Sequence, residues 1–374
     1  MKIKSVSELT DFYYDHLSDA IDTLEDERRS IVRTYIAINV VAALVALPAL
    51  IWGVKHLHGD IGGAMWSIGG VLAVWAWIVS FLYKWITEKY SAAFKARVIR
   101  PLIDAIAPGK LHYYPANSVS LYQFQRSRLF AGKIDKFEGA DLVKGEINGV
   151  FFQFSSVHAY RQVRQRAPGF GLRTANNPDA LLQAAARDRW STLFQGFFMV
   201  AEFGKHFEGT TLILPDADDP NVFGFLDGVD TPKPWLSRDR RVKMDSPLFE
   251  GTFNVYSTDP IEAHYLLTHS MMERIMQLKQ LVGARPMYLS FNGGHLYIAI
   301  ANDDDELFRP AVFRSAKAFK IALDYITTIR NSVAIVEILQ INLRNWTKKE
   351  GERSGVERFL HEYDAELSPK RPPK

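Results

Sequence analysis

The feature that most constrains this chain is a pair of long segments without a charged residue, residues 34–54 and residues 61–83. A helix of about 20 apolar residues crosses the hydrocarbon core of a bilayer, which is about 30 Å thick. Helices in the core of a soluble protein are rarely apolar on every side over such a length, because one side usually faces polar groups. The two segments therefore predict two transmembrane helices.

The connection between these segments and the charges around them predict the topology. Only residues 55–60 separate the segments, so we expect a helical hairpin with both chain ends on one side of the membrane. The connection carries one basic residue, Lys55. The outer flanks of the hairpin carry Arg28, Arg29, Arg33, Lys84, Lys89, Lys95, Arg97 and Arg100. By the positive-inside rule, we expect the termini in the cytoplasm and the connection outside.

The membrane part offers no transport path of its own. Ionisable side chains inside a membrane usually mark such a path, and neither charge-free segment contains one. A channel or transporter subunit would therefore need several copies of the chain around a shared pore.

The composition of the whole chain is that of a protein with a large folded part outside the bilayer. Hydrophobic residues make up 47%, charged residues 23%, and the mean hydropathy is −0.10, which are values of ordinary globular proteins. The formal net charge of +3 lacks the basic excess of nucleic-acid-binding proteins. The absence of cysteine excludes disulfides, Cys-ligated metal sites and a Cys nucleophile.

Four further segments complete the predicted organisation. Residues 1–33 form an acidic amphipathic helix on the cytoplasmic side. Residues 84–110 form a basic juxtamembrane helix, whose helical path we expect to end at Pro101, because proline lacks the N–H that a helix interior needs. Residues 111–344 form a cytoplasmic domain, and residues 345–374 form a polar, flexible tail.

The sequence predicts that the cytoplasmic domain is an α+β fold, with an antiparallel sheet and helices that cover it. The clearest hairpin is residues 287–300, where Asn292-Gly293-Gly294 supplies a tight turn. Other strands are predicted near residues 146–160, 196–201, 210–214 and 252–257. Helices are predicted at residues 178–190, 260–283 and 311–343. Strand hairpins with segregated helices are typical of α+β domains. We expect the long last helix to cover the sheet, with a coiled-coil dimer as the alternative.

Basic residues supply the candidate binding sites for anions or lipids. The juxtamembrane group, which would face anionic head groups, consists of Lys84, Lys89, Lys95, Arg97 and Arg100. A second group lies in a predicted surface loop, residues 159–177, and consists of Arg161, Arg164 and Arg166. His158 lies beside this loop, so an anion could bind between it and the arginines.

Motifs that would identify an enzyme are missing. The sequence has no phosphate-binding Walker loop, no G-x-S-x-G elbow and no H-E-x-x-H helix. His56, His58 and Asp60 could bind a transition metal, although a solvated turn explains them as well. His264 and His269 are expected on one helix, but five residues apart and so on different faces. The aspartates of residues 215–247 lack the spacing of a calcium loop. We therefore predict no cofactor and no metal.

Several stretches resemble a bacterial family of membrane proteins known as domain of unknown function 3137. They include FNVYSTDPIEAHYLLTHSMMERIMQL (253–278), MYLSFNGGHLYIAI (287–300) and DELFRPAV (305–312). The resemblance covers roughly residues 30–315, and one departure is His269, where the family usually has proline. It implies an inner-membrane protein with a cytoplasmic α+β domain and no established activity. It also implies a LemA-type membrane protein as a partner.

The family motif favours a structural role over a catalytic one. Its members, expected to position a helix on the sheet, are Tyr256, Asp259, Glu262, Ala263, Leu266, Leu267 and Glu273. The leading hypothesis is therefore a membrane-anchored scaffold or interaction component, with the bilayer and a membrane protein or a second copy of the chain as partners. The alternatives are a membrane-tethered enzyme, such as a hydrolase, and an oligomeric channel or transporter subunit.

Overall fold

The computed structural model describes residues 4–56, 61–130, 132–147, 149–164, 188–216, 241–302, 306–310, 312–315, 317 and 319–339. The chain divides into two compact units. The helical unit contains Lys2–Pro108 and Phe308–Arg330, and the sheet unit contains Gly109–Leu307 together with the chain from Asn331 onward.

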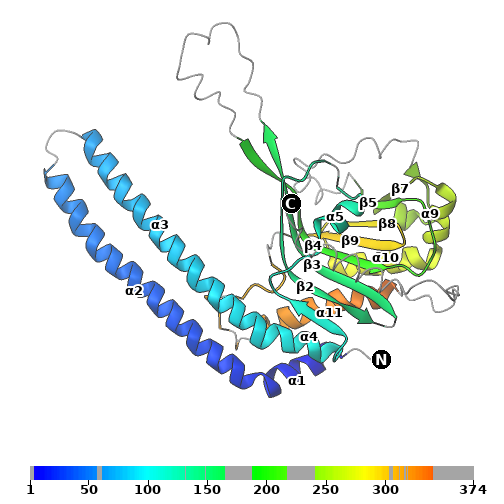
Figure 1. Ribbon diagram of the computed structural model, residues 1–374, viewed down its shortest axis with the longest axis horizontal. Coiled ribbons are helices and arrows are strands. Elements are labelled where there is room, and N and C mark those ends of the chain that lie inside the picture. The colour runs from blue at the N-terminus through cyan, green and yellow to red at the C-terminus, as the bar shows by residue number, and fades with distance from the viewer. Residues whose placement is uncertain are drawn as a thin grey trace, which may run out of the picture. The chain divides into compact units, whose positions relative to one another are not determined.

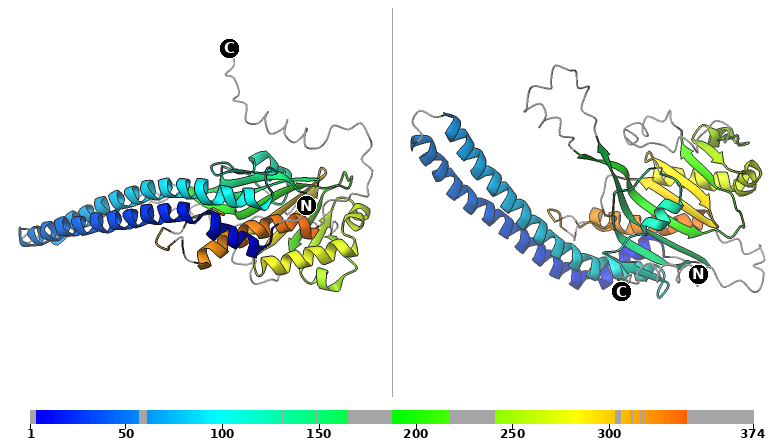
Figure 2. Two further views of the ribbon diagram at one scale, coloured as in Figure 1. Left: turned by 90° about the horizontal axis from the view of Figure 1, so that it is seen from below. Right: turned by 45° about the horizontal axis from the view of Figure 1, so that its top comes forward.

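Two long helices dominate the helical unit. They are α2 (Ser18–His56) and α3 (Ile61–Phe94), and they lie side by side as an antiparallel pair in all three views (Figures 1 and 2). Each helix contains one of the charge-free segments and continues from it into a charged flank, so α2 begins well before residue 34 and α3 ends well after residue 83. Within the described residues, none of the helices reaches the combination of length and apolar character that a membrane crossing requires.

The amino-terminal helix is interrupted where the sequence predicted one continuous helix. Ser5 caps α1 (Val6–His16) through a capping box with Glu8, which satisfies amide groups that have no partner within the helix. The helical path breaks at Leu17, and α2 starts at Ser18. The expected apolar stripe is nevertheless buried, with Leu9, Tyr13, Leu17 and Leu24 all in the core of the helical unit.

The prediction that the juxtamembrane helix ends at Pro101 is wrong. A π-helical turn, η1 (Lys95–Ile99), joins α3 to α4 (Arg100–Ile106), so the helical path runs past the proline. The Arg100 N–H donates to the Lys95 carbonyl, one residue further back than in an α-helix. Pro101 then lies in the first turn of α4, where a missing N–H leaves no helical bond unmade.

In the described part of the sheet unit, nine strands form one antiparallel sheet in the order β1-β2-β3-β4-β9-β8-β5-β7-β6 (Figure 1). The strands are β1 (Leu111–Tyr114), β2 (Lys136–Ile147), β3 (Val150–Arg164), β4 (Asp188–Glu202), β5 (Thr211–Pro215), β6 (Arg241–Val242), β7 (Phe253–Ser257), β8 (Met287–Asn292) and β9 (His295–Ala301). The predicted α+β class is confirmed, as are the strands at 196–201, 210–214, 252–257 and the hairpin 287–300.

Two predictions fail at the ends of β3 and β4. Residues 159–177 were expected to form a loop, but the first of them belong to β3. Tyr160–Arg164 pairs there with Asp188–Thr192 of β4. The last residues of the expected helix 178–190 are therefore strand, because cross-strand pairing overrides their helical pattern. The rest of these two segments, most of the acidic loop after Asp216 and the tail 345–374 lie outside the described residues.

Helices cover both faces of the sheet. On one face, α5 (Leu121–Arg126) packs Phe124 against Phe198 of β4 at a ring distance of 5.0 Å, and α10 (His269–Val282) lies on the other face (Figures 1 and 2). The expected helix 260–283 is two helices, since α9 (Pro260–Leu266) ends before Thr268, which caps α10. His264 and His269 consequently belong to different helices. His269 is the first residue of α10, a position where proline is also favoured, so this departure leaves the helix boundary unchanged.

The last described helix, α11 (Phe319–Leu339), is divided between the units. Its first part belongs to the helical unit, where the Tyr325 ring contacts the Phe94 ring of α3 at 5.2 Å. Only the part from Asn331 onward belongs to the sheet unit. The expectation that the whole helix covers the sheet is therefore wrong for its first half.

Candidate functional site

The family motif in the sheet unit holds the loop after β4 against α9. The Asp259 carboxylate caps α9 by accepting from the Ile261 N–H at 2.8 Å and the Glu262 N–H at 3.3 Å. The Glu262 carboxylate accepts from the N–H groups of Glu208 at 3.0 Å and Gly209 at 2.7 Å. A Cβ on Gly209 would lie 2.4 Å from this carboxylate, so the close approach requires glycine.

Lys205, in the same loop, contacts the other end of α9. The sequence analysis did not single out this lysine. Its Nζ donates to the Tyr265 carbonyl at 2.6 Å and lies 4.3 Å from the centre of the Tyr265 ring. A cation is favourable at the carboxyl end of a helix, where carbonyl groups have no helical partner. Burial lowers the pKa of the Lys205 ammonium group. The segment FGKHFEG contains this lysine, but no spacing rule relates it to Tyr265, about sixty residues away.

The other motif residues build the core around this loop. Ala263, Leu266 and Leu267 are buried, and Tyr256 packs against the apolar core below α5. Glu273 is different, because its side chain is 63% exposed and pairs with His269 at 3.3 Å. The motif therefore contains residues that shape one corner of the sheet unit, and the carboxylates of Asp259 and Glu262 bind main-chain groups there.

The juxtamembrane basic residues divide into exposed and buried members. Lys84, Lys89 and Arg100 are exposed on the helical unit, and Arg97 pairs with Glu27 at 3.0 Å while remaining 46% exposed. Lys95 is only 5% exposed, because it lies on the inner side of the π-helical turn. Its expected contact with lipid head groups is therefore wrong.

In the second basic group, the structure describes the side chain of Arg161 but not those of Arg164 and Arg166, so the expected anion site stays a prediction. Arg161 lies half-buried on β3, Arg164 ends that strand, and Arg166 lies outside the described residues. Both ring nitrogens of His158 already have partners, the Tyr160 hydroxyl at 2.8 Å and the Thr192 hydroxyl at 3.3 Å. The imidazole thus has partners on β3 and β4.

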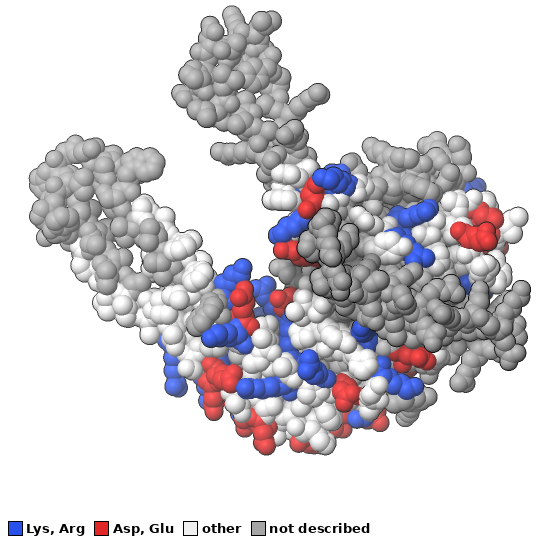
Figure 3. Space-filling view, viewed as in Figure 1, with Lys and Arg blue, Asp and Glu red and all other residues white. Residues whose placement is uncertain are grey.

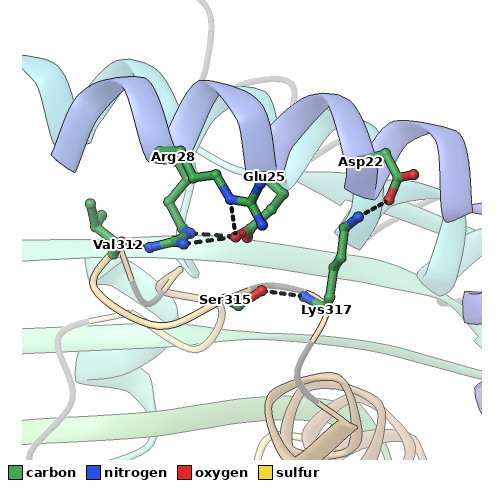
Figure 4. Close-up of polar contacts among 7 residues, drawn as sticks. Asp22, Glu25, Arg28, Val312, Ser315 and Lys317 are labelled. Atoms are coloured by element: carbon green, nitrogen blue, oxygen red, sulfur yellow. Dashed lines mark hydrogen bonds and ion pairs between the residues drawn. The ribbon is translucent and has the colours of Figure 1, made fainter. Parts of the chain in front are cut away.

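In the helical unit, buried and exposed ion pairs bind the loop before α11 to α2 (Figure 4). Glu25, 2% exposed, forms two bonds with Arg28 at 2.7 and 2.9 Å. Arg28 also donates to the Val312 carbonyl at 3.2 Å, and its bond to Glu25 raises the pKa of the Arg28 guanidinium. Lys317 pairs with Asp22 at 2.6 Å. We call these contacts the loop clamp.

Three aromatic rings lie next to the loop clamp at the base of the hairpin. The ring centres of Tyr35 and Tyr83 are 5.6 Å apart, and Phe313 from the clamped loop lies 6.0 Å from Tyr35 and 5.8 Å from Tyr83. We call these three residues the aromatic cluster. Sequence reasoning missed Phe313, because it follows the charge-free segments by more than two hundred residues.

A hollow of about 490 Å³ in the sheet unit lies between α10 and α8 (Pro247–Glu250). Ser246, His269 and Glu273 are among its lining residues, the residue types of a hydrolytic triad. However, the Ser246 hydroxyl accepts from the Phe249 N–H at 3.4 Å as the cap of α8. Among the described contacts, no hydrogen bond joins Ser246 to His269, and the imidazole instead pairs with Glu273 at 3.3 Å.

Metal binding has no support in the described part of the chain, where no group of three or more His, Asp or Glu residues is placed to hold an ion. The candidate set of His56, His58 and Asp60 lies in a segment whose side chains the structure does not describe.

Comparison with family models gives a match over part of the chain. Residues 192–341 match the family model described as "Protein of unknown function (DUF3137)". The chain thus carries the domain of unknown function 3137 over these residues, which begin in β4 and extend beyond Leu339. The resemblance seen in the sequence motifs is confirmed, with a later start and a later end than residues 30–315.

Other comparisons add little. None of the curated proteins matches the chain. A solved structure with some similarity is the crystal structure of the mycobacterial trehalose monomycolate transport factor A, TtfA, with 10% sequence identity, 61% of this chain and 88% of that chain covered, and a TM-score of 0.28. A TM-score of this size does not establish a common fold.

Proposed function

We propose that this protein is anchored in a membrane by the α2–α3 hairpin and presents its sheet unit to protein partners as a non-catalytic interaction component of a membrane complex. The observation that carries this proposal is that the two charge-free segments lie in one helical hairpin on which several described apolar side chains are exposed.

The exposed side chains of the hairpin support lipid as the surrounding medium. The large apolar side chains that are more than half exposed are Ile36, Val40, Val41, Leu44, Trp77 and Phe81. Figure 3 shows the described part of this arm without charged residues, which begin only at its base. A continuous exposed apolar surface of this kind marks a membrane or protein interface.

The distribution of charge supports an orientation. Arg33, Lys84 and Lys89 are exposed where the hairpin leaves its charge-free part. Basic residues of this kind are retained on the cytoplasmic side. In this proposal the termini and the sheet unit are cytoplasmic, the connection between α2 and α3 is external, and the membrane is the inner membrane of a bacterium.

An interaction role is favoured over catalysis because the polar motif residues already serve the fold. Asp259, Glu262 and Lys205 all bind main-chain groups, and Ser246 caps a helix. Partners in this proposal are a second copy of the chain or another membrane protein, and the family resemblance makes a LemA-type protein a candidate to test first.

Alkaline extraction of membranes tests the anchor. We predict that the full chain stays in the pellet after a carbonate wash, and that Val41→Arg together with Leu44→Arg releases it, because each arginine costs about 2.5–3.5 kcal/mol at the centre of a membrane-spanning helix. The matched control is Leu248→Arg, which places a charge on an apolar side chain of the sheet unit that is 70% exposed. Release of the unaltered chain by carbonate would contradict the anchor.

Crosslinking in native membranes tests the interaction role. We expect defined crosslinked species between the sheet unit and a protein partner or a second copy. A chain that purifies as an uncrosslinked monomer would contradict the interaction role. This result would not affect the proposed membrane anchor.

A further inference from the structure

The loop before α11 presents an exposed aromatic side chain at the base of the hairpin. Phe313 is 58% exposed, although its ring stacks on Tyr83 with an interplanar angle of 6° and meets Tyr35 edge-on at 69°. Tyr35 is the second residue of the first charge-free segment, and Tyr83 is the last residue of the second. The aromatic cluster therefore marks the level at which the apolar part of the hairpin ends.

The loop clamp holds Phe313 at this level. The carbonyl of Val312, its direct neighbour, accepts from Arg28 at 3.2 Å, and Arg28 is itself bound to Glu25. Val312 is 7% exposed, so the backbone beside Phe313 is packed against the unit. The backbone next to Phe313 is therefore held in place, and the Phe313 ring is exposed in this fixed position.

The charges around the aromatic cluster are mainly basic. Arg33, Lys84 and Arg314 are exposed, and the acidic neighbour on the same helix, Glu88, is 3.9 Å from Lys84 in an exposed pair. Aromatic rings prefer the boundary between hydrocarbon and water, and exposed lysine and arginine are attracted to anionic head groups. Both preferences are satisfied at the surface of an anionic leaflet.

We propose that the aromatic cluster is a bilayer-interface contact in which Phe313 inserts among the head groups beside the hairpin. The clamped loop is then a third point of membrane contact, far from the hairpin in sequence, and Arg33, Lys84 and Arg314 bind the surrounding phosphate groups. This inference rests on the proposed membrane anchor, because only an anchored hairpin places Tyr35 and Tyr83 at the interface.

Site-directed spin labelling tests this contact, and the absence of cysteine in the chain makes each engineered cysteine unique. The full chain is placed in vesicles of phosphatidylcholine and phosphatidylglycerol, and nitroxides are attached to Phe313→Cys, Val41→Cys and Leu248→Cys. Collision rates with oxygen, which concentrates in lipid, and with a water-soluble nickel complex give the depth of each label. Arg314→Cys gives a second position on the loop if the label at position 313 disturbs folding.

The expected order of depth distinguishes the two proposals. Labels at positions 313 and 314 should lie at the head-group level, between a deep label at 41 and a fully aqueous label at 248. Aqueous values at 313 and 314 with a deep label at 41 would overturn the loop contact and leave the anchor intact. Aqueous values at all positions would overturn the anchor and the loop contact together.

Discussion

Two polar side chains of the sheet unit bind main-chain groups of sequence-distant segments. Glu262 satisfies two N–H groups of the loop after β4, and Lys205 satisfies a carbonyl at the end of α9. Main-chain groups that lack a partner are costly when water is excluded. The family motif therefore contains residues that hold the loop after β4 against α9 in the sheet unit.

Replacing Glu262 with alanine should destabilise this corner. The change leaves the N–H groups of Glu208 and Gly209 without their acceptor, so we predict a loss of about 1–2 kcal/mol of unfolding free energy. Hydrogen exchange of residues 207–210 measured by mass spectrometry should speed up. The matched control is Glu273→Ala, since this glutamate is 63% exposed and binds only His269. Equal exchange in both variants would refute the role of Glu262.

Tyr90 should make the helical unit sensitive to alkaline pH. Burial raises the pKa of its hydroxyl from the ordinary 10.0 to about 12, and the positive charge of Arg28 opposes this rise. The folded state thus favours the neutral phenol, so this contribution to stability is complete below pH 10 and is lost as the pH rises toward 12. We predict that the thermal midpoint falls less over this range in Tyr90→Phe than in the unaltered chain. Parallel pH profiles would contradict the assignment.

At the scale of elements, the loop clamp shows how a short segment before α11 joins the helical unit. The Glu25–Arg28 pair is largely buried, whereas the Lys317–Asp22 pair has side chains 48% and 63% exposed. Buried pairs are costly to break singly, because the remaining charge loses its partner. Exposed pairs contribute little, since water screens them.

The two pairs should therefore respond differently to mutation. Glu25→Gln leaves the Arg28 guanidinium short of a carboxylate, and we predict a loss of about 3 kcal/mol with faster hydrogen exchange at residues 312–315. Lys317→Ala should cost less than about 1 kcal/mol. Thermal unfolding and hydrogen exchange of both variants check this difference, and a reversed order of effects would contradict the clamp.

Local patterns predicted most of the elements but not the contacts that organise them. The Asn292-Gly293-Gly294 turn indicated the hairpin 287–300, and the charge-free segments indicated α2 and α3. The break at Leu17 and the continuation past Pro101 depend on packing and on a π-helical turn, which no local pattern encodes. The strand pairing of Tyr160–Arg164 with Asp188–Thr192 and the Arg28–Val312 bond join distant residues, so single-sequence reasoning had no signal for them.

At the scale of the whole molecule, we propose that the α2–α3 hairpin is an anchor, while residues 192–341, most of them in the sheet unit, match the domain of unknown function 3137. The motif residues shape the sheet unit, the hairpin exposes apolar side chains, and the basic residues gather where the hairpin begins and ends. The proposed anchored interaction protein is consistent with all three observations.

Cysteine labelling in intact cells tests the central claim, that the hairpin crosses the membrane with its connection outside. A membrane-impermeant maleimide is applied to single-cysteine variants Gly59→Cys, in the connection, and Leu248→Cys, exposed on the sheet unit. We predict that Gly59→Cys reacts in intact cells and that Leu248→Cys reacts only after lysis. Reaction of both variants only after lysis, or of Leu248→Cys in intact cells, would contradict the account.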